Sequence, residues 1–457
     1  MDLSTPIIPS KPVFSGKTKG LDYKAVAVFA ATGFFLDQDT YYEEQKVLRP
    51  GRQYDIIENR VVDKGPYFSW TYKPVNRKFS DVVDEFQILF ETIIKEQSEG
   101  KKIILPLSGG LDSRSQAAAL KRIGVEVSSY SYEFQNGFPE AEISKQIAKA
   151  QGFEFKKFEI STGYLWNCID ELAVINGCYS EFTHPRQMAV HRDLGDLGDV
   201  FNLGHWGDVL FDDMGVLENL SFQDQVDVIV KKIVKKGGLA LGEALWKEWQ
   251  LEGTLYDYLR SRVEGLLSKI DIPNSANARI RAFKSLYWAP RWTSVNLSVF
   301  ESIKPICLPY YDNRMCEFIT RVPEEYLSKR KIQIEYLKRY APQLAKIVWQ
   351  EQKPFNLFNY QWNKAPYNLP YRALYKAKRT LSSKRYIQRN WELQFLGPNN
   401  EQKLEDRLFA EPSDLISKEL VHYFYHKFKN EDAVQYSHSV SILLTLKTFF
   451  KKQLKSR

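Results

Sequence analysis

The residues best suited to chemistry lie in a glycine-rich turn at residues 105–114, Leu-Pro-Leu-Ser-Gly-Gly-Leu-Asp-Ser-Arg. An apolar run leads into the turn, and a helix is expected to follow it. Glycines let the chain turn sharply and let backbone N–H groups approach a ligand closely. The free N–H groups and the positive end of the helix dipole favour an anion at this point. The turn therefore predicts a phosphate-binding site.

The polar side chains of the turn suit the same ligand. Ser108 and Ser113 can donate hydroxyl hydrogens to phosphate oxygens, and Asp112 supplies a carboxylate for Mg²⁺. No Gly-Lys-Ser/Thr follows, so this is not a Walker loop. A plain Gly-Gly turn that opens a helix would need neither the two serines nor the acid. We predict that a phosphate-bearing ligand and Mg²⁺ bind at Leu107, Ser108, Gly109, Gly110, Asp112 and Ser113.

Strands and helices alternate around this turn. The pattern predicts strands at 103–107, 125–134, 153–160 and 199–203, and helices from the turn to 122 and over 139–151. Such alternation is typical of an α/β fold in which a parallel sheet carries helices on both faces.

The flanking regions show other patterns. Aromatic and apolar runs at 26–29 and 67–72 predict strands, and 49–52 predicts a turn, in a small β-rich N-terminal region. Apolar residues at helical spacing predict a helix over 80–99 with Ser80 as its N-cap. Beyond about residue 217 the chain is mostly helical. At roughly 150 residues per domain, the length suggests two or three domains. We place them at 1–78, 79–370 and 371–457.

Composition excludes several classes of protein. Apolar residues make up 44% and charged residues 26% of the chain, which argues against disordered and collagen-like proteins. The longest apolar run, 25–36, is shorter than the about 20 residues that a membrane span needs. The first residues lack the features of a signal peptide. The four cysteines form no C-x-x-C pair, so we expect separate reduced thiols and a cytoplasmic protein.

The positive charge is concentrated near the C-terminus. Residues 371–457 contain 17 Lys and Arg against 9 Asp and Glu, and the rest of the chain is balanced. Such a region can meet nucleic acid, an anionic membrane surface or an acidic partner. It can also be the solvated face of helices, and nucleic acid is the partner that we least expect.

Ser-Gly-Gly-Leu-Asp-Ser resembles the signature of the PP-loop ATP pyrophosphatases, and its setting is similar to the synthetase domain of asparagine synthetases. That family cleaves ATP between the α- and β-phosphates, adenylates a carboxylate and lets an amine displace AMP. Residues 130–134, Tyr-Ser-Tyr-Glu-Phe, and 139–142, Pro-Glu-Ala-Glu, resemble the family's second strand and helix. The resemblance implies an adenine nucleotide α-hydrolase-like fold and places Tyr132 near adenine.

A second family motif, Gly-Asp/Glu-Gly-Ala/Ser-Asp-Glu-Leu-Phe, is similar to residues 203–211, Leu-Gly-His-Trp-Gly-Asp-Val-Leu-Phe. The resemblance implies that Asp208 is a second Mg²⁺ ligand, with Leu203 and Gly204 at the nucleotide. Two carboxylates at the ends of neighbouring strands suit a leaving pyrophosphate whose charge a metal must neutralise. His205 and Val209 replace family acids, which leaves the reactants open. His205 is either a base near neutral pH or a packed structural histidine.

Two later segments extend the resemblance. Residues 308–318 and 322–326 are similar to the family's Pro-Phe-Leu-Asp and Leu-Pro-x-Glu segments, although Pro305 and Cys307 replace the usual Glu and Arg. Residues 349–355, Trp-Gln-Glu-Gln-Lys-Pro-Phe, resemble its Arg-x-Lys-x-x-Phe element. The resemblance implies that Lys353 contacts pyrophosphate or the transition state, where an ammonium group offsets developing charge.

The N-terminal region resembles only the end of the family's glutaminase domain, at 32–36 and 47–51. A working glutaminase of this kind needs a cysteine exposed at position 2 after methionine removal. Position 2 is Asp2, and the first cysteine is Cys168. We therefore expect the nitrogen to come from free ammonia, from an amine in the substrate or from a separate glutaminase subunit.

These observations favour an ATP- and Mg²⁺-dependent carbon–nitrogen ligase that releases AMP. Its acid would be a small-molecule or peptide carboxylate, and ammonia or an amine would attack the adenylate. Two other functions stay open. A PP-loop enzyme that modifies RNA by sulfur transfer usually carries paired cysteines, which this chain lacks. A catalytically degenerate synthetase acting as a partner protein would explain His205, Val209 and Cys307.

Overall fold

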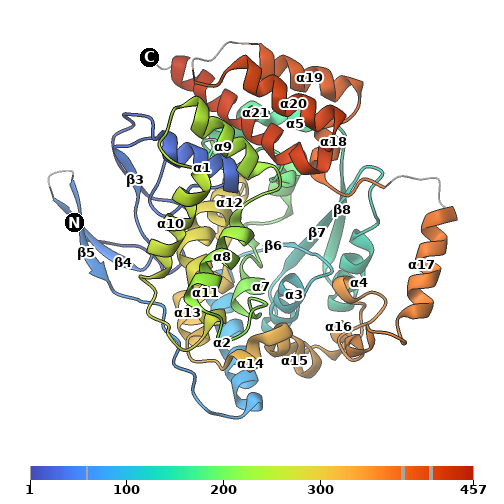
Figure 1. Ribbon diagram of the computed structural model, residues 1–457. Coiled ribbons are helices and arrows are strands. Elements are labelled where there is room, and N and C mark those ends of the chain that lie inside the picture. The colour runs from blue at the N-terminus through green and yellow to red at the C-terminus, as the bar shows by residue number, and fades with distance from the viewer. Residues whose placement is uncertain (1, 58–59, 382–385, 411–414, 456–457) are drawn as a thin grey trace.

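A five-stranded parallel sheet forms the centre of the fold (Figure 1). The computed structural model describes residues 2–57, 60–381, 386–410 and 415–455. The strand order is β10-β9-β6-β7-β8, and every neighbouring pair is parallel. The strands are β6 (Ile103–Pro106), β7 (Val127–Phe134), β8 (Glu154–Ile160), β9 (Val200–Asn202) and β10 (Ile306–Cys307). The predicted α/β fold with a parallel sheet is confirmed.

Helices cover both faces of this sheet (Figure 1). Because parallel crossovers are right-handed, β6-α3-β7-α4-β8 places α3 (Asp112–Ile123) and α4 (Ala141–Gln151) on one face. There α3 packs with α4, α2 (Phe79–Ser98) and α15 (Lys331–Tyr340). The chain then returns past β6 to β9, which places α5 (Leu165–Ile175) and α12 (Ser294–Glu301) on the other face. The Phe201 and Phe300 rings, 5.2 Å apart, join β9 to α12.

The N-terminal region contains the predicted small antiparallel sheets. β4 (Arg52–Ile57) lies between β1 (Asp2–Ser4) and β5 (Arg60–Pro66), and β2 (Phe14–Gly16) pairs with β3 (Gln45–Val47). The expected turn at 49–52 is present, and Gly51 adopts a φ of 66° there.

Two expected N-terminal strands and one helix cap are wrong. Residues 26–29 lie in a helix, α1 (Tyr23–Thr32), which is buried all round and so shows no helical alternation of polar and apolar residues. Residues 67–72 form no strand; Tyr67 and Tyr72 instead use their hydroxyls to anchor an irregular segment to Thr5 and Glu324. Lys78, not Ser80, is the N-cap of α2.

The rest of the chain is mostly helical, as predicted. A π-helical segment, Lys284–Thr293, joins α11 to α12. The remaining α-helices are α6 (His191–Leu194), α7 (Gly207–Leu210), α8 (Phe222–Ile233), α9 (Gly238–Glu248), α10 (Leu255–Leu267), α11 (Ala276–Phe283), α13 (Asn313–Ile319), α14 (Glu324–Leu327), α16 (Pro342–Ala345), α17 (Leu369–Leu381), α18 (Asn390–Phe395), α19 (Pro398–Phe409), α20 (Lys418–Asn430) and α21 (Ala433–Lys455).

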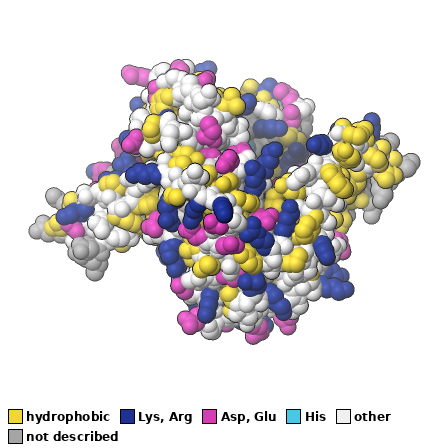
Figure 2. Space-filling model, turned by 90° about the horizontal axis from the view of Figure 1, so that it is seen from below, with side chains coloured by type: hydrophobic (Ala, Val, Ile, Leu, Met, Phe, Trp, Pro, Cys, Tyr) yellow, Lys and Arg dark blue, Asp and Glu magenta, His cyan; other side chains and the backbone are white. Residues whose placement is uncertain are grey.

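The C-terminal helices divide into two groups in space (Figure 1). Helices α18 to α21 gather over α9 and α5, and the Tyr41 and Phe449 rings stack with centroids 3.6 Å apart. Helix α17 lies apart from them and projects from the rest of the molecule (Figure 1). Its Leu369 and Leu374 side chains are exposed, and Figure 2 shows hydrophobic side chains over this projecting part. The four cysteines are free thiols, as expected. Within the described ranges, no helix combines the length and apolar character that a membrane span requires.

Candidate functional site

The glycine-rich turn lies where the strand order of the sheet reverses. β6 leads to β7 on one side, and β9 lies beside β6 on the other, so the loops after β6 and β9 diverge from adjacent strand ends. In parallel sheets such a switch point opens a crevice in which ligands bind. The two loops carry most of the predicted site residues, 107–113 and 203–208.

The first loop is closed by its own serines. The Ser108 N–H donates to Ser113 Oγ at 3.0 Å, and the two serine hydroxyl oxygens lie 3.1 Å apart. The Gly110 N–H donates to Ser108 Oγ at 3.3 Å. The hydroxyls expected to meet phosphate therefore also hold the loop in its turn around the start of α3. Leu107 continues the sheet, because its N–H donates to Tyr130 O at 2.7 Å.

Gly109 is needed because a distant segment lies directly on it. Its N–H donates to the Gln350 side-chain oxygen at 3.1 Å, and the Gln350 N–H donates to Gly109 O at 3.2 Å. A Cβ at Gly109 would lie 2.6 Å from Gln350 Cβ, closer than real contacts allow. The segment that carries Lys353 is thus anchored to the loop three residues before that lysine. The Lys353 side chain itself is exposed.

Arg114 strengthens the same junction, and sequence reasoning missed it. Its buried guanidinium donates to the carbonyl oxygens of Leu344, Ile347 and Val348, at 3.2, 3.0 and 2.8 Å, and to that of Gly109 at 3.1 Å. Burial lowers the pKa of Arg114 to about 10, so the group stays charged at neutral pH. Its placement in the sequence, two residues after Asp112 on a helix with a small-residue face, was the available signal.

Asp112 is the most perturbed acid of the site. It lies in the first turn of α3, where Oδ1 accepts hydrogen bonds from Arg330 Nη2 and, at 2.9 Å, from Gln333 Nε2. Burial raises the pKa of Asp112 to about 6; Arg330 opposes this shift and Asp208 adds to it. Arg330 and its neighbour Lys329 have φ values of 62° and 57°, a left-handed conformation that costs non-glycine residues energy.

The loop after β9 packs directly on Asp112. A Cβ at Gly207 would lie 2.8 Å from Asp112 Cγ and 2.9 Å from the Tyr310 ring, so only glycine fits there. A Cβ at Gly204 would lie 3.0 Å from Asp112 Cβ. Asp208 follows in α7 with an exposed side chain, and its charge reaches Asp112, Lys284 and Arg330. The fold therefore brings the two predicted carboxylates into one site.

These two carboxylates fit Mg²⁺ in the manner of phosphate-dependent enzymes. Within the described part of the chain, no group of three or more His, Cys, Asp or Glu forms a complete metal cage. Mg²⁺ is usually held by one or two carboxylates together with water and substrate phosphates, so a complete cage is not required. Arg330 and Gln333 both bind Oδ1 of Asp112, and Oδ2 accepts no hydrogen bond from the described residues.

His205 lies within the loop after β9, and Tyr132 lies on the neighbouring strand β7. His205 is partly buried, and its Nδ1 finds no hydrogen-bond partner among the described residues. Burial lowers its pKa to about 4, which leaves the ring neutral near pH 7. Tyr132 lies on β7 with the Arg186 guanidinium 5.3 Å from its ring centroid. Leu203 is buried, and its N–H donates to Cys307 O at 2.9 Å.

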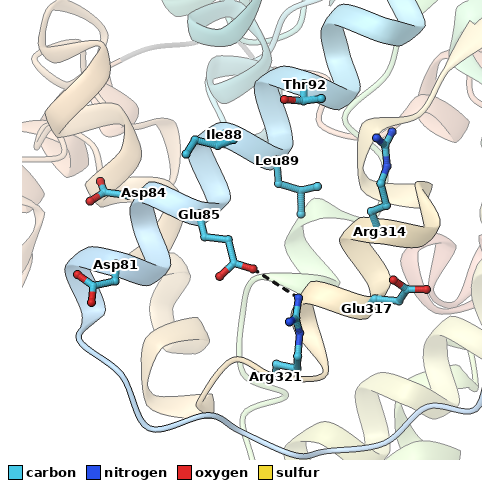
Figure 3. A pocket seen from close by; sticks show the side chains of 9 residues that line it. All are labelled: Asp81, Asp84, Glu85, Ile88, Leu89, Thr92, Arg314, Glu317 and Arg321. Atoms are coloured by element: carbon cyan, nitrogen blue, oxygen red, sulfur yellow. Dashed lines mark hydrogen bonds and ion pairs between the residues drawn. The ribbon is translucent and has the colours of Figure 1, made fainter.

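A surface hollow of about 750 Å³ lies elsewhere, between α2 and α13 (Figure 3). Its two arginines form ion pairs with nearby acids: Arg321 contacts Glu85 at 3.4 Å, and Arg314 contacts Glu96 at 2.6 Å. None of the predicted site residues lines it. Asp312, in the family-like segment 308–318, likewise acts locally, because it caps α13 and pairs with Arg314.

A family comparison agrees with this geometry. Residues 88–190 match the family model described as Asparagine synthase. Over these residues the chain is similar to asparagine synthases. The match includes the loop at 107–113 and Tyr132, while His205, Asp208 and Lys353 lie beyond it. The match supports a relationship of this region to a family of ATP-dependent synthetases. A comparison with curated proteins finds no match.

Proposed function

We propose that the protein is a ligase that uses ATP to join a carboxylic acid to ammonia or an amine, with release of AMP and pyrophosphate. A carboxylate oxygen attacks the α-phosphorus of ATP, and the bond from that phosphorus to the bridging oxygen of pyrophosphate breaks. The amine then attacks the acyl carbon of the adenylate. The bond to AMP breaks and the amine loses a proton, so that an amide remains.

One observation carries the proposal: the glycine-rich loop and the β9 loop meet at the switch point with Asp112 and Asp208 in one site. N–H groups at the start of α3 suit phosphate oxygens. Asp112 and Asp208 would hold Mg²⁺, which when bound offsets the negative charge of the phosphates. Residues 350–352, tied to Gly109, would keep the exposed Lys353 ammonium beside the leaving pyrophosphate.

His205 suits the second half of the reaction. Its ring is neutral near pH 7, so an unprotonated nitrogen can accept the proton that the attacking amine loses. The Nδ1 atom without a partner among the described residues offers a hydrogen-bonding position to that nucleophile. Such a base is weak, so the proton would pass on to solvent.

A second candidate function is a partner protein that binds nucleotide without turnover. The Arg330 contact favours it, because this buried arginine binds Oδ1 of Asp112 and balances the charge that a metal would otherwise neutralise. In an active enzyme this ion pair must rearrange or share the carboxylate with the metal.

The test is a product analysis with Mg²⁺-ATP, a panel of carboxylic acids, and ammonium or simple amines. We expect AMP and pyrophosphate to appear only with particular acids. In Asp112→Asn the rate should fall on the order of 100-fold or more, while Asp193→Asn, a matched change on an exposed acid, should leave it unchanged. Circular dichroism would show that both variants fold. ADP and phosphate as products would overturn the adenylation mechanism, and ATP binding without AMP across the panel would favour the partner protein.

A further inference from the structure

Two lysines and two tryptophans form a row beside Asp208. Lys284, Trp288 and Trp292 lie four residues apart in the π-helical segment. The Lys284 Nζ is 5.2 Å from the Trp288 centroid and 5.6 Å from that of Trp206. Lys235, just after α8, reaches the same row: its Nζ is 5.6 Å from the Trp288 centroid and 5.3 Å from that of Trp292. Trp288 is thus flanked by two ammonium groups.

Neither ammonium group has an anionic partner of its own. With the described residues, the ammonium groups of Lys235 and Lys284 form no ion pair and no hydrogen bond, although charge from Glu181 and Asp208 reaches them. Burial lowers the pKa of both lysines, to about 8 for Lys284, so Lys284 is mainly charged near pH 7. A buried charge without a partner is costly, and proteins keep such charges chiefly at functional sites.

The row continues toward Tyr132, the residue that is predicted to lie near adenine. The His184 ring lies 4.5 Å from that of Trp292, and Arg186 lies over Tyr132. His184 and Arg186 are exposed to solvent, yet surrounding atoms and charges lower the pKa of His184 to about 3. Ring and cation contacts thus connect Lys284, beside Asp208, through the Trp288 and Trp292 rings to His184, two residues before the Arg186 that lies over Tyr132.

The acids near this row of lysines and tryptophans already have partners. Glu181 accepts hydrogen bonds from the Thr183 N–H at 2.7 Å, from Thr183 Oγ1 at 2.6 Å and from Ser441 Oγ. The charge of Glu140 raises the pKa of Arg186, and Asp208 is predicted to bind the metal. Among the described residues this leaves no free carboxylate to receive a substrate ammonium group, whereas Lys235, Lys284 and Arg186 would repel one.

From this arrangement we infer that the acid substrate carries two negative charges and no ammonium group, with its carbon skeleton against Trp288 and Trp292. This inference rests on the proposed function. The reacting carboxylate lies on the Lys284 side, beside Asp208 and the α-phosphate. The second anionic group lies by Lys235 and is either a carboxylate or a phosphate-type group, two sources that share one recognition chemistry. An α-amino diacid such as aspartate is disfavoured at this site.

The experiment compares acids that differ in one charged group. Succinate, glutarate and adipate are set against their monoamides, their α-amino counterparts and, for the second source, 3-phosphonopropionate. Binding is measured by calorimetry with a non-hydrolysable ATP analogue and Mg²⁺, and adenylation by ATP–pyrophosphate exchange. At one chain length or more, the diacid or the phosphonate should bind at least about tenfold more tightly than the monoamide and the amino acid.

Variants assign this preference to the row. Lys235→Met should remove the preference for the second charge, so that diacid and monoamide bind with similar affinity, whereas Lys236→Met, on the exposed neighbouring lysine, should behave as wild type. Tighter binding of the α-amino acids, no charge preference at any chain length, or an unchanged Lys235→Met variant would each overturn the inference. Selective diacid binding without exchange would support it and count against the proposed ligase. AMP formed preferentially with aspartate would support the proposed ligase and overturn the inference about the acid substrate.

Discussion

Lys284 shows at the level of a single residue how a site can lower the stability of the protein. Its ammonium group is partly buried against Trp206 and Trp288 and forms no ion pair with the described residues. Burial is the main cause of its lowered pKa, and Asp208 offsets only part of the shift. A residue kept only for packing would be better replaced by an uncharged side chain of similar length.

We therefore expect Lys284→Met to raise the free energy of unfolding at pH 7 by on the order of 1–3 kcal/mol, while acid binding weakens. The folded pKa of about 8 lies below the ordinary 10.5. Between these values the unfolded chain binds more protons, so this lysine's contribution makes wild-type stability rise with pH. The advantage of the variant should thus shrink between pH 7 and pH 9.5 in urea denaturation, with Lys236→Met as control. A variant less stable than wild type at pH 7 would show that the lysine has a structural role.

At the scale of elements, the site depends on two loops that touch through glycines. The β9–α7 loop reaches Asp112 only because Gly204 and Gly207 leave room for it, and Trp206 between them adopts a left-handed φ of 76°. The Trp206 indole N–H donates to Ser285 Oγ at 3.0 Å, which fixes this strained residue and links the loop to the segment that carries Lys284.

Gly207→Ala should therefore displace the Asp112 carboxylate or the β9 loop. A misplacement of about 1 Å at a reacting centre costs on the order of 100-fold in rate, and we expect AMP formation to fall by that amount or more. Gly265→Ala is the matched control, because a Cβ there meets nothing within 4 Å in helix α10. It should keep full activity and gain about 0.5–1 kcal/mol of stability. Equal activity of the two variants, measured alongside thermal denaturation, would contradict this account of the loop contact.

The same elements explain what sequence could and could not predict. The strands and helices around the loop were predictable, because apolar runs, a glycine turn and helical spacing are local signals. Helix α1 was missed because burial on every side removes those signals. Arg330 and Gln350 were missed for another reason: they lie 218 and 241 residues from Asp112 and Gly109, and only tertiary packing brings them to the loop. The roles of Asp208, His205 and Lys353 stay predictions.

At the scale of the whole molecule, both ends of the chain share one core. Helix α1 packs on α9, and α9 packs on α21. The Phe29 ring contacts those of Phe35 and Tyr41, with centroids 4.7 and 5.8 Å apart, and Tyr41 stacks on Phe449 near the C-terminus. The division at residue 78 follows a change of sequence pattern and stays a prediction; from the shared core we expect that residues 1–78 do not unfold alone.

Phe29→Ala tests that cooperativity. Phe29 is fully buried, so the cavity should cost about 3–5 kcal/mol. Because α1, α9 and α21 share the core, we expect one calorimetric transition at a lower temperature, and nucleotide-analogue binding should be lost at the same midpoint. Ile88→Ala, at a side chain that is 63% exposed on α2, should change stability by no more than about 0.5 kcal/mol. A separate early transition in Phe29→Ala, with nucleotide binding unchanged until the main one, would instead make the N-terminal region an independent folding unit.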